Sequence, residues 1–415
     1  MKLFTPLTLP NGSVLPNRLA KAAMEENMAD KDHAPSSQIL RLYQKWAEGE
    51  VGLILTGNVM VDGRAMTGPG GIVLEDERHL DRFQRWSQVA RSRGAQVWMQ
   101  ISHPGRQVPA ALGQQAWAPS AIALEMGSLS KQFSMPKEMS ETEIREVIRR
   151  FEDTARLAEK SGFNGVQIHA AHGYLLSQFL SPLSNKRKDR WGGSLENRAR
   201  LLVEILRGVR NIVSSGFAVS VKLNSADFQR GGFSPDDAKR VISILNDLKV
   251  DLVELSGGSY EAPAMQGMAR DGRTLAREAY FLEYAKMSVA TAKMPLMVTG
   301  GIRRREVAEH VIESGIAMAG IASALSIDPN LPIKWRTSAE SSPAFRPINW
   351  NSKPLASAAG MAMVKFQLER LSHGRSPNPN VSPVYALVKA QLDFKRKAWK
   401  YRRWVGQTSQ FRAQC

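Results

Sequence analysis

The sequence predicts an α/β protein that forms a (β/α)8 barrel, a closed ring of eight parallel strands surrounded by helices. Two observations lead to this prediction. Short runs rich in Val, Ile and Leu alternate with amphipathic helical stretches along most of the chain, and such runs are typical of strands buried on both faces of a parallel sheet. Eight alternations fit a closed barrel, a fold that routinely reaches about 250 residues or more in one domain.

Each expected strand is a short apolar run. The eight runs cover 19–24, 51–60, 96–103, 165–170, 218–224, 251–256, 295–299 and 318–324. The carboxyl ends of barrel strands share one face, where active sites of this fold are built. The segment 104–139 has no clear periodicity and contains several Gly, Pro and Ser residues, so we expect it to cross that face as a lid.

The helices between the strands carry recognisable start signals. Helices are expected over 141–160, 195–213 and 235–247, each with apolar residues at helical spacing. Ser140 and Glu143 at the start of the first have the spacing of a capping box, in which the two residues satisfy each other's backbone N–H groups.

The chain divides into two parts by composition. Residues 1–340 are expected to form the barrel, and 341–415 a linker followed by a basic helical extension. The stretch 341–360 is rich in Ser, Pro and Ala, whereas 361–373 and 383–404 have helical patterns.

The formal net charge is +17, which favours anionic partners without selecting one. The expected helix 383–404 mixes aromatic residues with cations. Packing on the barrel or a contact between subunits is the favoured interpretation, and contact with an anionic membrane surface is the alternative. A homo-oligomer is therefore one of the alternatives. Nucleic acid is not expected as a partner, because no known binding module accompanies the charge.

Cysteine usage and hydropathy limit the class of protein. The single cysteine, Cys415, excludes an internal disulfide framework and a cysteine-ligated cluster within this chain. Pro and Gly interrupt the first residues, and no apolar run reaches the roughly 18 residues that a spanning helix needs. A cytoplasmic protein is the expectation.

Two imidazoles and a phenol lie close together after the fourth expected strand, at His169, His172 and Tyr174. The histidines could bind a metal, serve a structural role, or polarise a substrate oxygen. We favour the last, because no third ligand with standard metal spacing is evident. Tyr174 could pack in the core, or it could donate a proton.

The last two expected strands end in small residues. Gly300 and Gly301 follow one, and Ala322 and Ser323 follow the other. Loops at these two strand ends often bind phosphate through backbone N–H groups. Phosphate binding is the favoured interpretation, and a simple tight turn at Gly300-Gly301 is the alternative.

One stretch, from His169 to Arg198, resembles a known family signature. It contains HAAHGYL, QFLSPLSNKR and WGGSLENR. Supporting matches are Asn17-Arg18-Leu19, Ala22-Ala23-Met24, Thr56-Gly57, Gln100, His103-Pro104-Gly105-Arg106 and Gly300-Gly301-Ile302-Arg303. On these residues, the chain resembles the old yellow enzyme family over about residues 1–335.

The resemblance implies non-covalent FMN as cofactor and NADPH or NADH as reductant. The implied cofactor-binding positions are Ala23, Met24, Glu25, Gly57, Gln100, Lys222, Gly300, Gly301, Arg303, Ala322 and Ser323. His169 and His172 would bind the carbonyl oxygen of a small-molecule substrate, with Asn27 nearby, and Tyr174 would supply a proton. The implied reaction reduces the C=C bond of an α,β-unsaturated carbonyl compound by hydride transfer from flavin N5.

Three positions depart from the family pattern. Lys222 stands where arginine is usual, which keeps the charge but loses the bidentate fork. Glu25 stands where threonine, serine or cysteine is usual, and its carboxylate would oppose negative charge on the reduced flavin unless it is protonated or turns toward Lys21 or another cation. Ser323 stands where arginine commonly holds the phosphate, so Arg303 and backbone N–H groups are expected to do so.

Two other functions remain open. A flavin-dependent NAD(P)H oxidase or dehydrogenase with another substrate would use the same residues, apart from the proton donor. A flavin-binding barrel with little turnover could act as an interaction protein through its basic extension.

Overall fold

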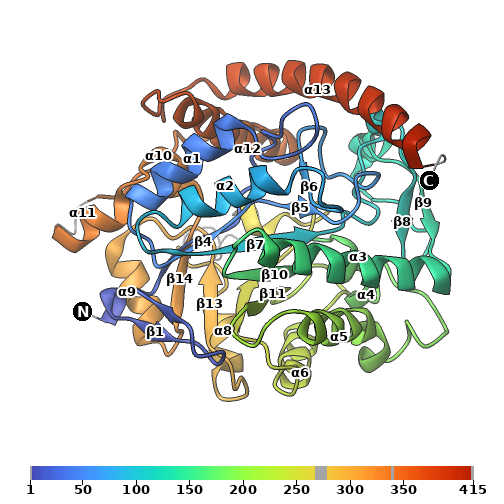
Figure 1. The fold of residues 1–415 in the computed structure, drawn as a ribbon, viewed down its shortest axis with the longest axis horizontal. Helices are drawn as coiled ribbons and strands as arrows, with labels where there is room; N and C mark the ends of the chain where they lie inside the picture. Colours follow the sequence, from blue (N-terminus) through green and yellow to red (C-terminus); the bar gives the residue numbers. More distant parts are fainter. Residues whose placement is uncertain (1, 267–277, 338–340, 413–415) are drawn as a thin grey trace.

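The computed structural model describes residues 2–266, 278–337 and 341–412, and its centre is a closed barrel of eight parallel strands (Figure 1). The strands are β3 (Leu19–Lys21), β4 (Leu53–Leu55), β7 (Gln96–Ser102), β10 (Gly165–Ala170), β11 (Ala218–Asn224), β12 (Leu252–Ser256), β13 (Leu296–Thr299) and β14 (Met318–Ile321). The ring closes because β14 pairs with β3 and β7 pairs with β10. The predicted barrel is confirmed.

Helices surround the ring as the periodicity predicts. They are α1 (Ser37–Glu48), α2 (Leu80–Ala90), α3 (Glu141–Lys160), α4 (Leu175–Leu180), α5 (Leu195–Ile212), α6 (Pro235–Leu245), α8 (Leu282–Val289), α9 (Arg305–Glu313), α10 (Ser323–Ile327) and α11 (Leu331–Thr337). The capping box before α3 is confirmed, since the Glu143 N–H donates to Ser140 Oγ and the Ser140 N–H donates to the Glu143 carboxylate.

The predicted strand over 51–60 is wrong in its second half. β4 ends at Leu55, and the separate strand β5 (Val59–Met60) pairs with the far end of β7 and with β6 (Ile72–Val73). Thr56 explains the break, because its Oγ1 accepts the Gln100 N–H at 2.9 Å and donates to the Gly57 carbonyl at 2.8 Å. A side chain thus replaces the backbone ladder at this point.

The amino end of the barrel is closed by a hairpin of β1 (Leu7–Thr8) and β2 (Val14–Leu15). Its leucines pack against the first residues of several barrel strands in one apolar cluster. The members of this cluster are Leu7, Leu9, Leu15, Ala20, Ala22, Leu53, Leu55, Trp98, Ala218, Leu252, Met297 and Met318. A ligand site is therefore expected at the opposite end of the barrel, where the carboxyl ends of the strands lie.

The segment expected as a lid contains short elements. They are η2 (Ala110–Leu112), β8 (Ala116–Ala118), η3 (Gly127–Gln132) and β9 (Pro136–Glu138), and β8 pairs with β9 in parallel. Arg106 anchors the segment, because its guanidinium donates to Glu261 at 2.6 Å and to the carbonyl of Ala123 at 3.0 Å.

The C-terminal extension forms two helices, α12 (Lys353–Ser372) and α13 (Pro383–Arg412), which cross the top of the molecule in Figure 1. The predicted linker over 341–360 is too long, because α12 begins at Lys353 with a proline in its first turn, a position that proline tolerates.

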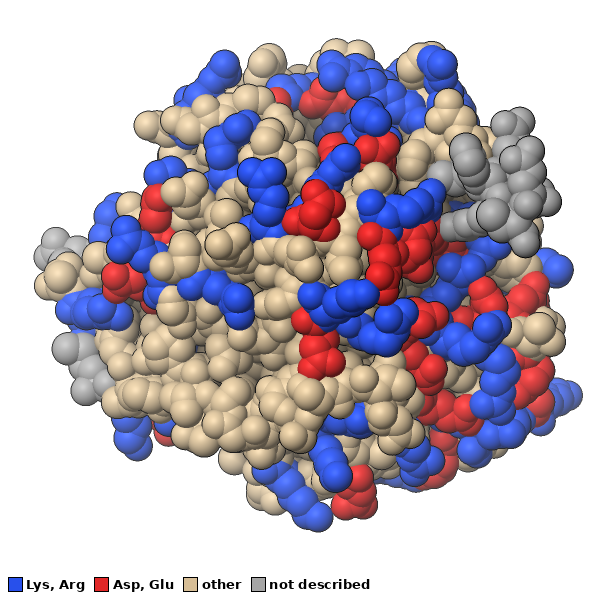
Figure 2. Space-filling model, in the orientation of Figure 1, with Lys and Arg blue, Asp and Glu red and all other residues tan. Residues whose placement is uncertain are grey.

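The extension packs on the barrel, as the favoured interpretation holds. The buried Tyr401 donates its hydroxyl to the Gly63 carbonyl at 2.9 Å, and the Trp404 ring lies 4.4 Å from the His33 ring. Figure 2 shows Lys and Arg side chains along the upper edge of the molecule, where α12 and α13 lie. None of the helices in the described ranges combines the length and apolarity that crossing a membrane requires.

Candidate active site

Three side chains of the predicted catalytic group meet where β10 ends. His169 belongs to β10, and His172 and Tyr174 follow it before α4 begins. The His169 ring lies 4.8 Å from the Tyr174 ring and 5.1 Å from the His172 ring, measured between centroids. The turn places His172 at φ 61°, and its backbone N–H donates to Asn224 Oδ1 at 3.0 Å. The chain thus presents two imidazoles and a phenol in one cluster.

Both imidazoles are neutral near pH 7. Burial lowers the pKa of His169 well below its ordinary value, and the charge of Lys222 lowers it further. The same causes lower the pKa of His172. Nδ1 of His169 accepts the Ala171 N–H at 3.2 Å, which assigns the ring proton to Nε2. Nε2 of His172 lies 2.7 Å from Ser256 Oγ. His169 can therefore donate a hydrogen bond to a ligand oxygen.

The hydroxyl of Tyr174 lies in a small polar group. It is 3.2 Å from the Tyr260 hydroxyl and 3.4 Å from Asn58 Nδ2. Burial raises the pKa of Tyr174 well above its ordinary value, and the neighbouring Tyr260 and Glu25 raise it further. The phenol consequently keeps its proton at neutral pH and is able to donate it.

A second polar cluster lies inside the barrel and includes two of the predicted cofactor residues. Gln100 donates to Gln167 at 2.7 Å, and Gln167 donates to Glu254 Oε2 at 2.9 Å. Glu254 Oε1 forms an ion pair with Lys222 Nζ at 2.8 Å and accepts a hydrogen bond from Thr299 Oγ1 at 2.6 Å. Glu254 is fully buried and Lys222 is 3% exposed, and the two buried charges are paired with each other.

Glu25 follows β3 and turns toward the C-terminal extension. Its Oε2 lies 3.1 Å from Lys365 Nζ on α12, and its Oε1 accepts a hydrogen bond from Thr67. Burial raises the pKa of Glu25, but the Lys365 charge and hydrogen bonds from Thr67, Lys365 and Asn27 outweigh it, so the pKa is lowered. Glu25 is therefore an ionised carboxylate with a cation beside it.

The expectation that Glu25 could turn toward Lys21 is wrong, because Lys21 is engaged by other groups. Its Nζ lies 3.6 Å from Glu26 Oε1, donates to the Leu55 carbonyl at 2.7 Å, and sits 4.2 Å from the Trp46 ring centroid. Burial lowers the pKa of Lys21 to about 8, although Glu26 opposes this. The alternative, that Glu25 turns toward another cation, is confirmed, and that cation is Lys365.

The predicted substrate residue Asn27 lies beside Glu25 in a left-handed conformation, with φ at 55°. Its carbonyl accepts a hydrogen bond from Lys397 Nζ of α13 at 2.7 Å. Its Oδ1 is buried and lacks a hydrogen-bond partner among the described residues. A ligand that donates a hydrogen bond here would satisfy that atom.

Gly57 lies beside the same segment. A Cβ at Gly57 would come 2.3 Å from the Met24 carbonyl oxygen and 2.0 Å from Glu26 Oε2. The close approach of the two chain segments therefore requires glycine. Met24 is buried and Ala23 is partly exposed, and their predicted contact with a flavin ring stays a prediction.

The predicted phosphate site coincides with a cavity of about 340 Å³. Its lining includes Gly301, Arg303, Ser323 and Ala324, which follow β13 and β14. Gly300 and Gly301 have φ of 131° and 70°, values that side-chain-bearing residues rarely adopt.

A carboxylate that the sequence analysis missed lies in this cavity. Glu278 Oε1 is 2.9 Å from Nε of both Arg303 and Arg304. Two cations and one anion leave a net positive charge, which suits a phosphate group. Glu278 nevertheless competes with a phosphate for the hydrogen bonds of Arg303.

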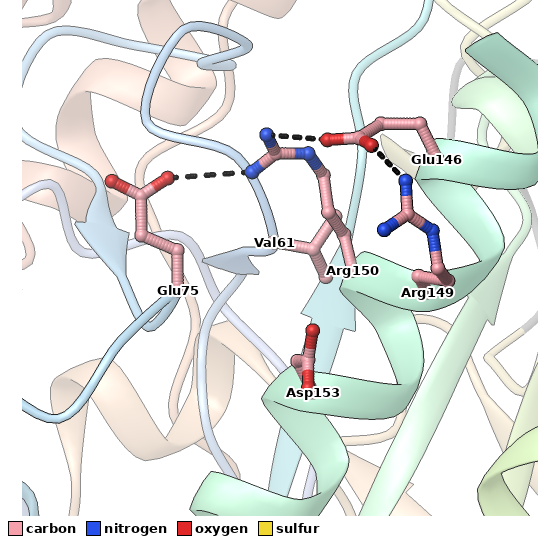
Figure 3. A pocket seen from close by; sticks show the side chains of 6 residues that line it. All are labelled: Val61, Glu75, Glu146, Arg149, Arg150 and Asp153. Carbon is pink, nitrogen blue, oxygen red and sulfur yellow. Dashed lines mark hydrogen bonds and ion pairs between the residues drawn. The ribbon is translucent and has the colours of Figure 1, made fainter. Parts of the chain in front are cut away.

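A second cavity, of about 140 Å³, lies between α3 and the loops that follow β5 and β6 (Figure 3). Arg150 extends between Glu146, at 2.8 Å, and Glu75, at 3.6 Å, and Arg149 pairs with Glu146. The Arg150–Glu75 pair connects α3 to a loop, whereas the other two pairs lie within α3. In the described residues, no group of three or more His, Cys, Asp or Glu is placed to hold a metal ion.

Several site residues gave weak or no signals in the sequence. Glu254 was missed, although an acid inside the apolar run DLVELS is an anomaly that could have identified it as a buried polar group. Tyr260 lies in a loop after β12, where a phenol is ordinary. Lys365 is one lysine among many on a helix remote in sequence, so only the tertiary structure identifies it.

The barrel fold and the match to a family model define this protein as an FMN-dependent oxidoreductase. The chain belongs to the NADH:flavin oxidoreductase / NADH oxidase family, whose model matches residues 2–341, and the predicted old yellow enzyme resemblance is confirmed. The enzyme class and the use of FMN with NADH or NADPH are confirmed with it.

Two relatives are named NADH-dependent flavin oxidoreductase iliE. The protein from Neonectria sp. is 39% identical over 352 residues, which are 79% of this chain and 46% of the relative. The protein from Hypocrea jecorina is 37% identical, over 79% of this chain and 87% of the relative. The chain thus spans less than half of one relative and most of the other.

Solved structures agree on the fold. A 2-naphthoyl-CoA reductase in complex with 2-naphthoyl-CoA has a TM-score of 0.73 and 27% identity, over 81% of this chain and 52% of the other. The old yellow enzyme homologue from Zymomonas mobilis has a TM-score of 0.70 and 24% identity, over 82% and 94%.

The residues present fit FMN. The cavity beside Gly301 and Ser323 has the size and positive balance that a phosphate needs. Gln100 and Lys222 supply an amide and a cation inside the barrel, toward the polar edge expected for the flavin ring. Glu25 departs from the family pattern, but the Lys365 charge balances it.

Proposed function

We propose that this protein reduces the C=C bond of α,β-unsaturated carbonyl compounds, using FMN and NADH or NADPH. One observation carries the proposal: a neutral imidazole and a protonated phenol lie with ring centroids 4.8 Å apart at the end of β10. A carbonyl oxygen needs a hydrogen-bond donor, and the carbon next to it needs a proton. The two rings meet both needs within one small site.

His169 and His172 bind the carbonyl oxygen in this proposal. The N–H at Nε2 of His169 donates to it, which draws electrons from the double bond and favours attack at the β-carbon. Because burial keeps the imidazoles neutral, they bind a neutral ketone or aldehyde without placing a full charge beside it. Asn27, whose buried Oδ1 has no hydrogen-bond partner among the described residues, contacts the substrate in the same proposal.

Tyr174 supplies the proton to the carbon next to the carbonyl. Its high pKa retains the proton until the substrate carbon becomes basic. The Tyr260 hydroxyl at 3.2 Å can stabilise the phenolate that remains and pass a proton to it. The tyrosine pair therefore accounts for the proton that alkene reduction requires and simple oxidation of NADH does not.

FMN, when bound, supplies the hydride, which it takes from the nicotinamide. We propose that Ala23, Met24 and Gly57 lie along the flavin ring, and that Gln100 and Lys222 contact its polar edge. Gly300, Gly301, Arg303, Ala322 and Ser323 hold the phosphate. The relatives' names support NADH as the reductant.

Anaerobic absorbance spectroscopy tests the proposal. The purified protein, loaded with FMN, is reduced with NADH or NADPH and then mixed with 2-cyclohexenone, and the product is identified by mass. We expect the yellow colour to bleach and then return, with cyclohexanone formed in equal amount. Bleaching without return of colour would contradict alkene reduction and favour an oxidase or a dehydrogenase acting on another substrate. A protein that takes up no FMN would overturn the whole assignment.

A further inference from the structure

Both helices of the C-terminal extension contact the short segment that follows β3. Lys365 of α12 places Nζ 3.1 Å from Glu25 Oε2, and Lys397 of α13 donates to the Asn27 carbonyl at 2.7 Å. The partners are 340 and 370 positions apart along the chain. Glu25 and Asn27 are the residues expected beside the cofactor and the substrate. The extension therefore touches the site itself.

The Glu25 carboxylate pairs with the extension and lies close enough to the tyrosine pair for its charge to act on both phenols. Its negative charge contributes to the raised pKa of Tyr174 and of Tyr260. The charged or titratable groups around it are thus Lys365 on one side and the two phenols on the other, with Thr67 as a hydrogen-bond donor. Only Lys365 among them brings a positive charge.

Lys365 is held firmly, because α12 is anchored to the barrel near it. Leu368 and Leu371 belong to the main apolar core together with residues of α1. Arg41 of α1 donates to the Ser372 carbonyl at 2.7 Å. The backbone of Lys365 therefore has a fixed place relative to Glu25, which keeps the ammonium group within reach of the carboxylate.

We infer that the C-terminal extension is part of the active site, and that Lys365 is a positioning residue that holds and balances the Glu25 carboxylate beside the FMN ring and Tyr174. The inference rests on the proposed function, because it uses the FMN site. Where the family usually has a neutral hydroxyl or thiol, this chain has an ion pair. The pair keeps the local net charge at zero, so reduction of the cofactor to an anionic form is not opposed.

The test compares wild type, Lys365→Met, Glu25→Gln and the double variant, all as full-length protein loaded with FMN. Lys365→Met leaves the carboxylate unbalanced, so we expect a more negative midpoint potential for the bound flavin. Glu25→Gln leaves the cation unbalanced and should shift the potential the other way. The double variant removes both charges and should return it close to the wild-type value.

A pH titration of the flavin spectrum separates the ion pair from a purely structural role. In Lys365→Met, Glu25 takes up a proton at higher pH than in wild type, so a new pH-dependent spectral step should appear. It should be absent from the double variant. A step that persists in the double variant, or is missing from Lys365→Met, would overturn the inference.

Lys389→Met is the matched control, because Lys389 of α13 pairs with Glu369 of α12 and with Asp393 rather than with Glu25. It removes ion pairs of the extension but keeps the Glu25–Lys365 pair, so the potential should change much less than in Lys365→Met. An equal shift in Lys389→Met and Lys365→Met would contradict the inference. None of these measurements requires turnover with an enone, so failure of the proposed alkene reduction would remain distinguishable.

Discussion

Lys222 Nζ lies 2.8 Å from Glu254 Oε1 inside the barrel, on neighbouring strands and directly opposite in register. The carboxylate also accepts hydrogen bonds from Thr299 and Gln167. The cation expected at the polar edge of the flavin is therefore already balanced by an acid. Any change in one of the two partners alters both the stability of the barrel and the charge next to the cofactor.

Removing either charge should destabilise the fold. We expect Glu254→Gln and Lys222→Met each to cost about 3–5 kcal/mol, because each leaves a buried charge without its partner. The double variant should lose less than the sum of the two, since no unbalanced charge remains and the new amide oxygen could still accept from Thr299. Urea unfolding of the four proteins measures this, and strictly additive losses would argue against the pair.

Glu278 should weaken FMN binding, because it occupies hydrogen bonds of Arg303 and Arg304 in the phosphate cavity. We expect Glu278→Gln to lower the Kd for FMN several-fold and Arg303→Met to raise it. Both effects should shrink at high salt, which screens charges near the surface. Fluorescence titration with FMN at two salt concentrations measures the change. Unaltered affinity in Glu278→Gln would place the phosphate elsewhere.

Acid should unfold the protein partly through His103, whose pKa burial lowers to about 4 from 6.5. Between pH 6.5 and pH 4, the His103 imidazole binds a proton in the unfolded state but stays neutral in the folded state. Stability is therefore lost as the pH falls from 6.5 to 4, by about 3 kcal/mol for this group. In His103→Asn, the free energy of unfolding should fall less steeply as the pH decreases over that range. The difference in slope should correspond to the uptake of about one proton on unfolding. Equal slopes would show that His103 accepts a proton without unfolding.

The barrel was predictable from the pattern together with the family resemblance, because most strands are short apolar runs and the longer helices between them have a periodic apolar face. Errors occur where a side chain replaces backbone pairing, as at Thr56, or where a helix begins within a composition typical of linkers, as at Lys353. Local patterns do not register such tertiary hydrogen bonds.

The site was predictable to the extent that its residues sit at strand ends. His169, His172 and Tyr174 are close in sequence, and the structure brings them together. Glu278 and Lys365 could not be assigned, because their partners Arg303 and Glu25 lie 25 and 340 positions away. The identity of a charge partner at that distance depends on the closed barrel and the docked extension.

The central claim is that Tyr174 gives its proton to the substrate, and separate measurement of the two half-reactions tests it most directly. In Tyr174→Phe, stopped-flow reduction of the bound flavin by NADH or NADPH should proceed within about twofold of wild type, because that step needs no proton donor. Reoxidation by 2-cyclohexenone should slow by about 10²–10⁴-fold, the usual contribution of a positioned acid. Reoxidation at the wild-type rate would contradict the assignment of Tyr174 as the proton donor.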